Sequence, residues 1–141
     1  MPIIKFDQQP RAYKDPITKK LEFTYIPIIP VRLSYKHRLG QFSVDCLLDS
    51  GADRNIFPSD YARVLGINIK KGVIVQHIGI GGASLLAYAH KVKLFLGNHS
   101  IQTVVDFSEE QTIPLLGREG FIRFFKKTVF NQETKQVEFE Y

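Results

Sequence analysis

The sequence has one cysteine, no tryptophan and no long apolar run. Because Cys46 is alone, a disulfide within the chain is excluded, and nothing indicates an oxidising compartment. No stretch approaches the about 20 apolar residues that a membrane-spanning helix needs, and the start of the chain lacks the apolar core of a signal peptide. We therefore expect a cytoplasmic protein with no membrane partner.

Little in the sequence could hold a metal ion or a phosphate. The four histidines lack the paired spacing of a zinc site and have no cysteine partners: His37, His77, His90 and His99. The glycine-rich run at 79–82 is not followed by the helix and the Gly-Lys-Ser/Thr ending typical of a phosphate-binding loop. We expect neither a metal nor another cofactor.

Length and composition indicate one globular domain. The chain has 141 residues, of which 44% are hydrophobic and 23% are charged, and its Phe, Ile and Val content favours strands. The formal net charge is +5, but the basic residues occur in short dispersed pairs such as Lys19-Lys20 and Lys70-Lys71. Such pairs indicate solvated faces, so we expect no nucleic-acid partner.

The chain divides by composition at residue 22. Residues 1–22 are polar and contain three prolines, and three roles stay open for them: a mobile arm, an edge strand at an oligomer interface, or a flap over the rest of the protein. Residues 23–141 form the predicted folded domain. Pro27 and Pro30 place its first strand at a sheet edge or at a change of sheet.

Apolar alternation and turn residues predict an essentially all-β closed sheet. The predicted strands are 23–35, 41–48, 54–57, 67–70, 73–78, 90–96, 100–106, 128–130 and 137–141. A short helix is predicted at 60–65 with Ser59 as its N-cap, and one or two helical turns within 118–126. The phenylalanines of this last stretch are interpreted as core residues, not as a platform for stacking bases.

One run stands out, in which the apolar strand at 46–48 ends abruptly on Asp49, Ser50 and Gly51. A buried strand would deliver Asp49 into a tight turn, where burial or a second carboxylate can shift its pKa. Gly51 allows the backbone to turn sharply, and the Ser50 hydroxyl and neighbouring amides can hold the carboxylate. An ordinary Asx turn at a strand end is the alternative interpretation.

Three segments resemble, in the same order, the motifs of the retropepsin-like aspartic proteases. Asp49-Ser50-Gly51-Ala52-Asp53 resembles the active-site signature, and His77-Ile78-Gly79-Ile80-Gly81-Gly82 resembles the flap that closes over the substrate. Ile113-Pro114-Leu115-Leu116-Gly117-Arg118 resembles the segment that supports the active-site loop. The resemblance spans roughly residues 27–118 and implies a closed β-barrel of the acid-protease (retropepsin) type.

The resemblance implies a homodimeric aspartic endopeptidase. Metal-free hydrolysis of an amide by acid–base chemistry needs two carboxylates that share a proton, and this chain has one such turn. Asp106 lacks the small-residue turn, and Asp53 is expected to be occupied elsewhere. The second Asp49 must then come from another copy, and each Ser50 would steady the opposing loop.

Further roles follow from the same motifs. The implied catalytic residues are Asp49, Ser50 and Gly51. An extended peptide would bind as an added strand, with its side chains in apolar pockets. The implied substrate-binding residues are Ala52, Asp53, Arg54, Gly79, Ile80, Gly81, Gly82, Ile113 and Leu115. Structural support is implied for Asp53, Gly117 and Arg118, with Asp53 and Arg118 as an ion pair that braces the loop.

The chain also departs from the retroviral pattern. Serine follows Asp49 where retroviral members often have threonine, and Arg54 replaces a common acidic residue, which would favour acidic substrate groups in an outer pocket. The chain after Gly120 is longer than in compact viral enzymes, and its own Met1 favours a free-standing protein. Two alternatives stay open: a retropepsin-like module that binds peptides or dimerises without turnover, and a small basic β-barrel that binds nucleic acid.

Overall fold

In the computed structural model, which describes residues 2–40, 43–79 and 81–141, the chain forms two compact units. One consists of Ile29–Phe124, and the other of Met1–Ile28 with Phe125–Tyr141. The predicted boundary at residue 22 falls inside a strand, β3 (Leu21–Ile26). The next strand, β4, begins at Ile28 in a different sheet, so the predicted change of sheet occurs at Pro27.

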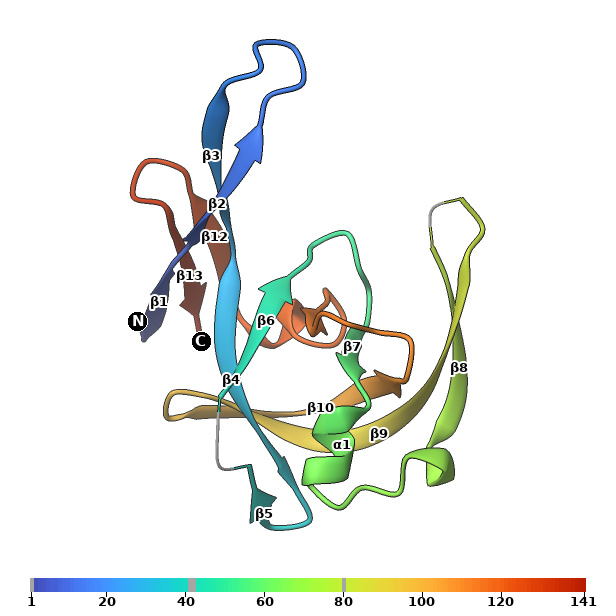
Figure 1. Ribbon diagram of the computed structural model, residues 1–141. Helices are drawn as coiled ribbons and strands as arrows, with labels where there is room; N and C mark the ends of the chain where they lie inside the picture. The colour runs from blue at the N-terminus through green and yellow to red at the C-terminus, as the bar shows by residue number, and fades with distance from the viewer. Residues whose placement is uncertain (1, 41–42, 80) are drawn as a thin grey trace. The chain divides into compact units, whose positions relative to one another are not determined.

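A closed barrel of six strands dominates the larger unit (Figure 1). Its hydrogen-bonded order is β4 (Ile28–Tyr35), β6 (Val44–Leu48), β11 (Leu115–Leu116), β7 (Asn55–Pro58), β10 (His99–Ser108) and β9 (Ser84–Leu96). Pairing of β4 with β9 closes the ring, while β5 (Arg38–Leu39) extends from β4 and β8 (Val73–Ile78) extends from β9. The prediction of an all-β closed sheet is confirmed.

Alternation of apolar residues explains why these segments form barrel strands. Along β6, Val44, Cys46 and Leu48 are buried while Asp45 is exposed, which is the period of two that a half-buried strand requires. Neighbouring strands contribute the same kind of inward residue, including Val31, Leu33, Leu94, Val105 and Phe107. Each fully buried side chain of this size contributes about 1.5–3 kcal/mol relative to exposure.

The smaller unit contains two sheets. A three-stranded sheet has the order β1 (Ile3–Asp7), β13 (Gln136–Glu140), β12 (Lys127–Asn131), and β2 (Gln9–Lys14) pairs with β3 as a hairpin. Phe139 anchors the first sheet, because its ring centroid lies 4.8 Å from that of Phe125 and 6.2 Å from that of Phe6. The terminal strands predicted at 128–130 and 137–141 are confirmed, and β1 is an edge strand of their sheet.

Helical structure is sparse and differs in part from the predictions. The short helix is present as α1 (Asp60–Val64), but Ser59 makes no side-chain capping bond. The strand predicted at 67–70 is wrong, because Ile69–Lys71 forms a 3-10 turn, η1. The amides of Lys71 and Gly72 donate to nearby carbonyls within this turn, which satisfies them without a partner strand. Within 118–126 the structure has one 3-10 turn, η2 (Ile122–Phe124).

Candidate active site

Asp49 lies directly after β6, where two parallel strands hold it in place. Leu48 of β6 is in register with Leu116 of β11, and the Asp49 amide donates to the Leu116 carbonyl at 2.8 Å. Leu48 and Leu116 are buried, whereas Asp49 is half-buried. The apolar strand therefore carries the carboxylate out of the core to the rim of the barrel, as the sequence predicts.

A tight turn fixes one oxygen of this carboxylate. The Gly51 amide donates to Asp49 Oδ1 at 2.9 Å, and the Ala52 amide donates to the Asp49 carbonyl at 3.1 Å. Among the described residues, Oδ2 of Asp49 and the Ser50 hydroxyl have no hydrogen-bond partner. This is the geometry of an Asx turn, which both interpretations of the sequence include. It leaves one carboxylate oxygen and one hydroxyl available.

Backbone bonds from the segment after β11 hold the turn from behind. The Arg118 amide donates to the Ala52 carbonyl at 2.7 Å, and the Glu119 amide donates to the Asp53 carbonyl at 2.8 Å. Gly117 lies so close that a Cβ there would be 2.6 Å from the Arg54 carbonyl oxygen. Only glycine fits at this position without a backbone shift.

The predicted pair of Asp53 and Arg118 is present. Arg118 Nη2 lies 2.5 Å from Asp53 Oδ1, and both side chains are more than half exposed. The Asp53 carboxylate raises the pKa of Arg118 through a hydrogen bond and its charge. Asp53 is also a predicted substrate-binding residue, and its carboxylate is already engaged here.

Asn55, which the sequence analysis does not single out, connects three segments behind the turn. Its side chain is fully buried, and its Nδ2 donates to the carbonyls of Val104 and Gly120 at 3.1 and 2.8 Å. Its Oδ1 accepts from the Gly117 amide at 3.0 Å. An asparagine at the start of a strand is common in turns, so no signal in the sequence identifies this role.

Arg54, which the sequence predicts to charge an outer substrate pocket, forms an ion pair with Asp106 and keeps 43% of its side chain exposed. Its Nε and Nη2 donate to the two oxygens of Asp106 at 2.5 and 2.7 Å. Asp106 is 1% exposed, and its Oδ2 also lies 2.8 Å from His77 Nε2. The Asp106 carboxylate raises the pKa of Arg54. A carboxylate within the protein thus pairs with the guanidinium charge. Arg54, His77 and Asp106 are far apart in the sequence, so local patterns do not predict this cluster.

The flap motif forms the tip of the β8–β9 hairpin. Ile78 pairs with Ser84, the Gly79 amide donates to the Ala83 carbonyl at 2.8 Å, and Gly81 and Gly82 have φ angles of +89° and +84°. The hairpin tip is confirmed, while Ile80 lies outside the described residues. In Figure 1 this tip and the β6–β7 connection, which carries Asp49, both lie toward the top of the view.

The remaining predicted pocket residues lie on either side of Pro114. Ile113 is 53% exposed and Leu115 is half-buried. Leu115 pairs with both Leu47 of β6 and Ile56 of β7, which places it beside the strand that ends at Asp49. An exposed isoleucine next to this strand is suited to contact an apolar ligand.

Solved structures similar to this chain include two proteases. One is a crystal structure of a retropepsin-like aspartic protease from Rickettsia conorii, with a TM-score of 0.64, 12% identity and 98% of both chains covered. The fold is retropepsin-like. The other is EIAV protease complexed with the inhibitor HBY-793, with a TM-score of 0.50, 21% identity, and 67% of this chain and 83% of that chain covered. At these identities the likeness concerns the fold.

Comparison by sequence finds no match, neither to a family model nor to a curated protein.

In the part of the chain that the structure describes, no helix is long and apolar enough to cross a bilayer. The same residues include no group of three His, Cys, Asp or Glu side chains placed to hold a metal ion.

Proposed function

We propose that this chain is an aspartic endopeptidase that acts as a homodimer. The observation that carries the proposal is Asp49 at the end of β6, with one carboxylate oxygen bound by the Gly51 amide and the other free among the described residues, on a retropepsin-like fold. The alternative of an ordinary Asx turn explains the first bond. The proposal also draws support from the combination, in one retropepsin-like barrel, of this turn at the end of β6 with a glycine-rich hairpin between β8 and β9.

In the proposed mechanism the two Asp49 carboxylates of a dimer share one proton. The ionised one takes a proton from water, which attacks the peptide carbonyl, and the protonated one polarises the carbonyl oxygen. Because one carboxylate must be ionised and the other protonated, activity would pass through an optimum as pH changes. An extended peptide would bind as an added strand beneath the β8–β9 hairpin, with Ile113 and Leu115 contacting its side chains.

The state of the other carboxylates supports the need for a second copy. Asp53 is engaged by Arg118, and Asp106 is buried and bound by Arg54 and His77. Neither is free to share a proton with Asp49. The exposed Ser50 hydroxyl would then find its partner in the opposing loop of the second subunit, as proposed from the sequence.

The test is a digest of a peptide library by the wild type and two isosteric variants. Asp49→Asn removes the proposed catalytic charge, while Asp45→Asn removes an exposed carboxylate from the same strand and serves as the matched control. Wild type and Asp45→Asn should cleave apolar peptides at mildly acidic pH in a pepstatin-sensitive manner. Asp49→Asn should stay folded and lose cleavage.

Protein concentration provides the second readout. Specific activity should rise with concentration and reach a plateau where sedimentation shows a dimer, because two chains complete one site. Cleavage that survives Asp49→Asn, or full activity in a strict monomer, would contradict the proposal. Saturable peptide binding without cleavage at any pH would identify a non-catalytic module instead.

A further inference from the structure

A basic groove opens on the larger unit, and Asp49 is not among the residues that line it. It has a volume of about 1010 Å³ and is bordered by residues from β4, η1, β9, β10 and the segment around η2. We define the basic groove by its six Lys and Arg residues: Lys36, Arg54, Lys71, Lys91, Lys93 and Arg123. Glu119 is the one acidic residue in the lining.

The groove accounts for the whole charge excess of the protein. Of the 19 Lys and Arg residues six line it, and of the 14 Asp and Glu residues one does, which leaves 13 of each sign elsewhere. The basic pairs in the sequence do not reveal this concentration of charge, because of Lys19-Lys20 and Lys70-Lys71 only Lys71 lines the groove. The other five basic residues of the groove are spread along the chain from Lys36 to Arg123. A concave surface of one sign concentrates its electric field and attracts counter-ions.

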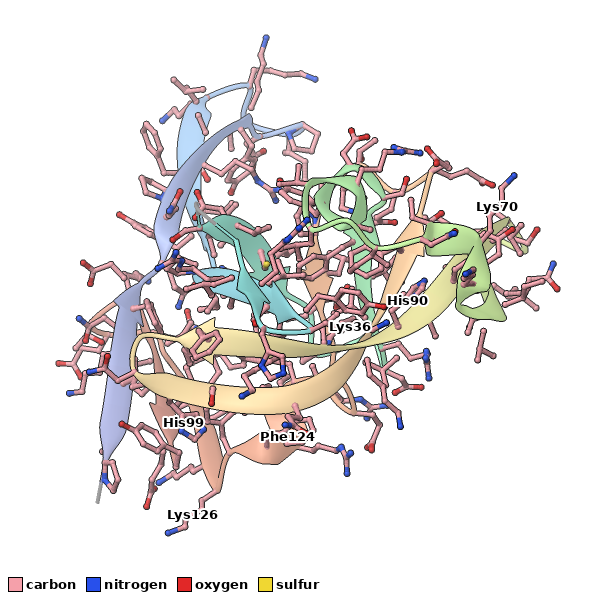
Figure 2. All side chains as sticks on the ribbon, turned by 90° about the horizontal axis from the view of Figure 1, so that it is seen from below. Lys36, Lys70, His90, His99, Phe124 and Lys126 are labelled. Carbon is pink, nitrogen blue, oxygen red and sulfur yellow. The ribbon has the colours of Figure 1, made fainter. Side chains whose placement is uncertain are left out.

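The register of the barrel explains how the lysines converge. Lys91 and Lys93 are two residues apart on β9, so both side chains leave the same face, and they pair with Val104 and Gln102 of β10. Lys36 follows the end of β4, which pairs with β9 at Lys93. Figure 2 labels three lining residues, Lys36, His90 and Phe124, which come from three separate segments of the chain.

Most of this charge is uncompensated. Among residues 2–40, 43–79 and 81–141, none of Lys36, Lys71, Lys91 and Lys93 has an acidic partner. The two arginines differ, because Arg54 is bound by Asp106 and Arg123 donates to the Glu119 carbonyl at 2.7 Å. Like charges held close together without partners destabilise the free protein, and a bound polyanion relieves the repulsion.

The chemistry of the lining favours a phosphate chain over a carboxylate. Arginine binds carboxylates and phosphates through its planar fork, and Asp106 occupies the fork of Arg54. The free charge of the groove therefore comes mainly from lysines, which bind phosphate as point charges. Two aromatic rings also line the groove, Tyr35 and Phe124, each with a cation near its face. Aromatic faces between cations are the usual platform for unpaired bases.

We propose that the basic groove binds single-stranded nucleic acid without sequence preference. The lysines contact the phosphodiester backbone, and Tyr35 and Phe124 offer faces on which bases stack. The groove volume suits a segment of a few nucleotides and exceeds what one phosphate needs. The proposed binding does not use Asp49, because residues 49–53 contribute nothing to the groove. Arg54, which follows this turn, does line the groove, with its guanidinium bound to Asp106.

The test uses fluorescence anisotropy with a labelled twelve-nucleotide oligothymidine and its ribouridine counterpart. The wild type should bind with a logarithmic salt slope of about −3 if four lysines contact phosphates, since each contact contributes about −0.7. The double variant Lys91→Gln, Lys93→Gln should bind about tenfold more weakly or worse, with a slope shallower by about 1.4. Circular dichroism checks that each variant is folded.

The matched control is Lys70→Gln, Lys126→Gln, which removes the same charge from two exposed lysines outside the groove. It should bind the oligonucleotide like the wild type. An equal loss of affinity in this control, or no binding by the wild type at 50 mM salt, overturns the proposal. It is also overturned if a polyglutamate peptide of equal charge competes as well as the oligonucleotide does.

Discussion

Arg54 and Asp106 are joined by two parallel hydrogen bonds although 52 residues separate them in the chain. Asp106 is 1% exposed, so its charge needs partners within the protein, and Arg54 and His77 are those partners. Because Arg54 follows Asp53 and His77 lies on β8, this carboxylate connects the Asp49 turn to the β8–β9 hairpin.

Asp106→Asn should therefore destabilise the protein. Arg54 would keep its position but lose the buried charge it faces, and the expected loss is about 2 kcal/mol or more in the free energy of unfolding. Urea denaturation measures it. The matched control is Asp60→Asn in the exposed pair with Arg63, which should cost less than about 1 kcal/mol. Equal losses for the two variants would refute the structural role of Asp106.

Gly117→Ala should disrupt the support of the Asp49 turn. The new Cβ would lie 2.6–2.7 Å from backbone atoms of Asp53 and Arg54, so the two segments must separate, at a cost of about 2 kcal/mol or more. Gly79→Ala is the control, because its Cβ would have an ordinary contact at 3.7 Å. Thermal unfolding should show a large decrease in Tm for the first variant and little change for the second.

Asn55→Ala should destabilise the protein, because buried backbone groups would lose hydrogen bonds. The Val104 carbonyl and the Gly117 amide would each lose the Asn55 side chain as a partner, and one such loss in the interior costs about 1–3 kcal/mol. The Gly120 carbonyl would keep its bond from the Thr103 hydroxyl at 2.6 Å. Hydrogen exchange should show faster exchange of the Gly117 amide. Asn98→Ala, in the exposed β9–β10 turn, should change stability by no more than about 0.5 kcal/mol. A slow Gly117 amide in Asn55→Ala would argue against this account.

Arg118→Gln should lower the proposed activity with little change in stability. The pair with Asp53 is exposed and adds little to stability, and backbone bonds from Arg118 and Glu119 still hold the turn. If the pair orients the turn for catalysis, as proposed, kcat should fall while the unfolding midpoint hardly moves. Arg63→Gln, which removes exposed ion pairs with Asp60 and Glu109, should leave kcat and the unfolding midpoint nearly unchanged. Equal kcat for Arg118→Gln and wild type would leave the pair without a catalytic role.

Cys46 should resist thiol reagents in the folded protein. Its side chain is fully buried, and burial, with a smaller contribution from the charge of Asp45, raises the pKa of the thiol well above its ordinary value. The folded state favours the protonated thiol, so this contribution to stability holds below the pKa of the unfolded thiol, about 8.5, and is lost as pH rises further. DTNB should react with the thiol only when denaturant is added. Rapid reaction of the native protein at pH 8 would contradict this.

The sequence predicts the parts of the site that are local. The strand before Asp49, the turn at Gly51, the strand after Arg54 and the glycine-rich hairpin all follow from alternation and turn residues within a few positions. The pair of Asp53 and Arg118 is long-range, and it was predictable because the family resemblance supplies it. Local patterns therefore predict the position of Asp49 at a strand end, and the resemblance to a known family predicts the ion pair of Asp53 and Arg118 beside it.

Other features depend on contacts that no local pattern encodes. In the sequence, Asp106 interrupts an apolar strand without an evident partner. Its partners become known only from the structure, which brings Asp106 of β10 close to His77 on β8 and to Arg54, which directly precedes β7. The apolar alternation around Ile67 and Ile69 suggests a strand, yet Ile69–Lys71 forms a 3-10 turn in which the Lys71 and Gly72 amides bond to nearby carbonyls. The basic groove likewise arises from register, because Lys36, Lys71 and Lys93 are distant in the chain.

β11 consists of two residues, yet it occupies the place between β6 and β7 in the ring. A ring of strands has no free edges only while every member is present. If Leu115 and Leu116 slipped by one residue, the fully buried leucine and the half-buried one would exchange faces, and β6 and β7 would both be left with unpaired backbone. The same slip would move the Leu116 carbonyl away from the Asp49 amide that it binds. A strand of two residues therefore both completes the ring and fixes the position of Asp49.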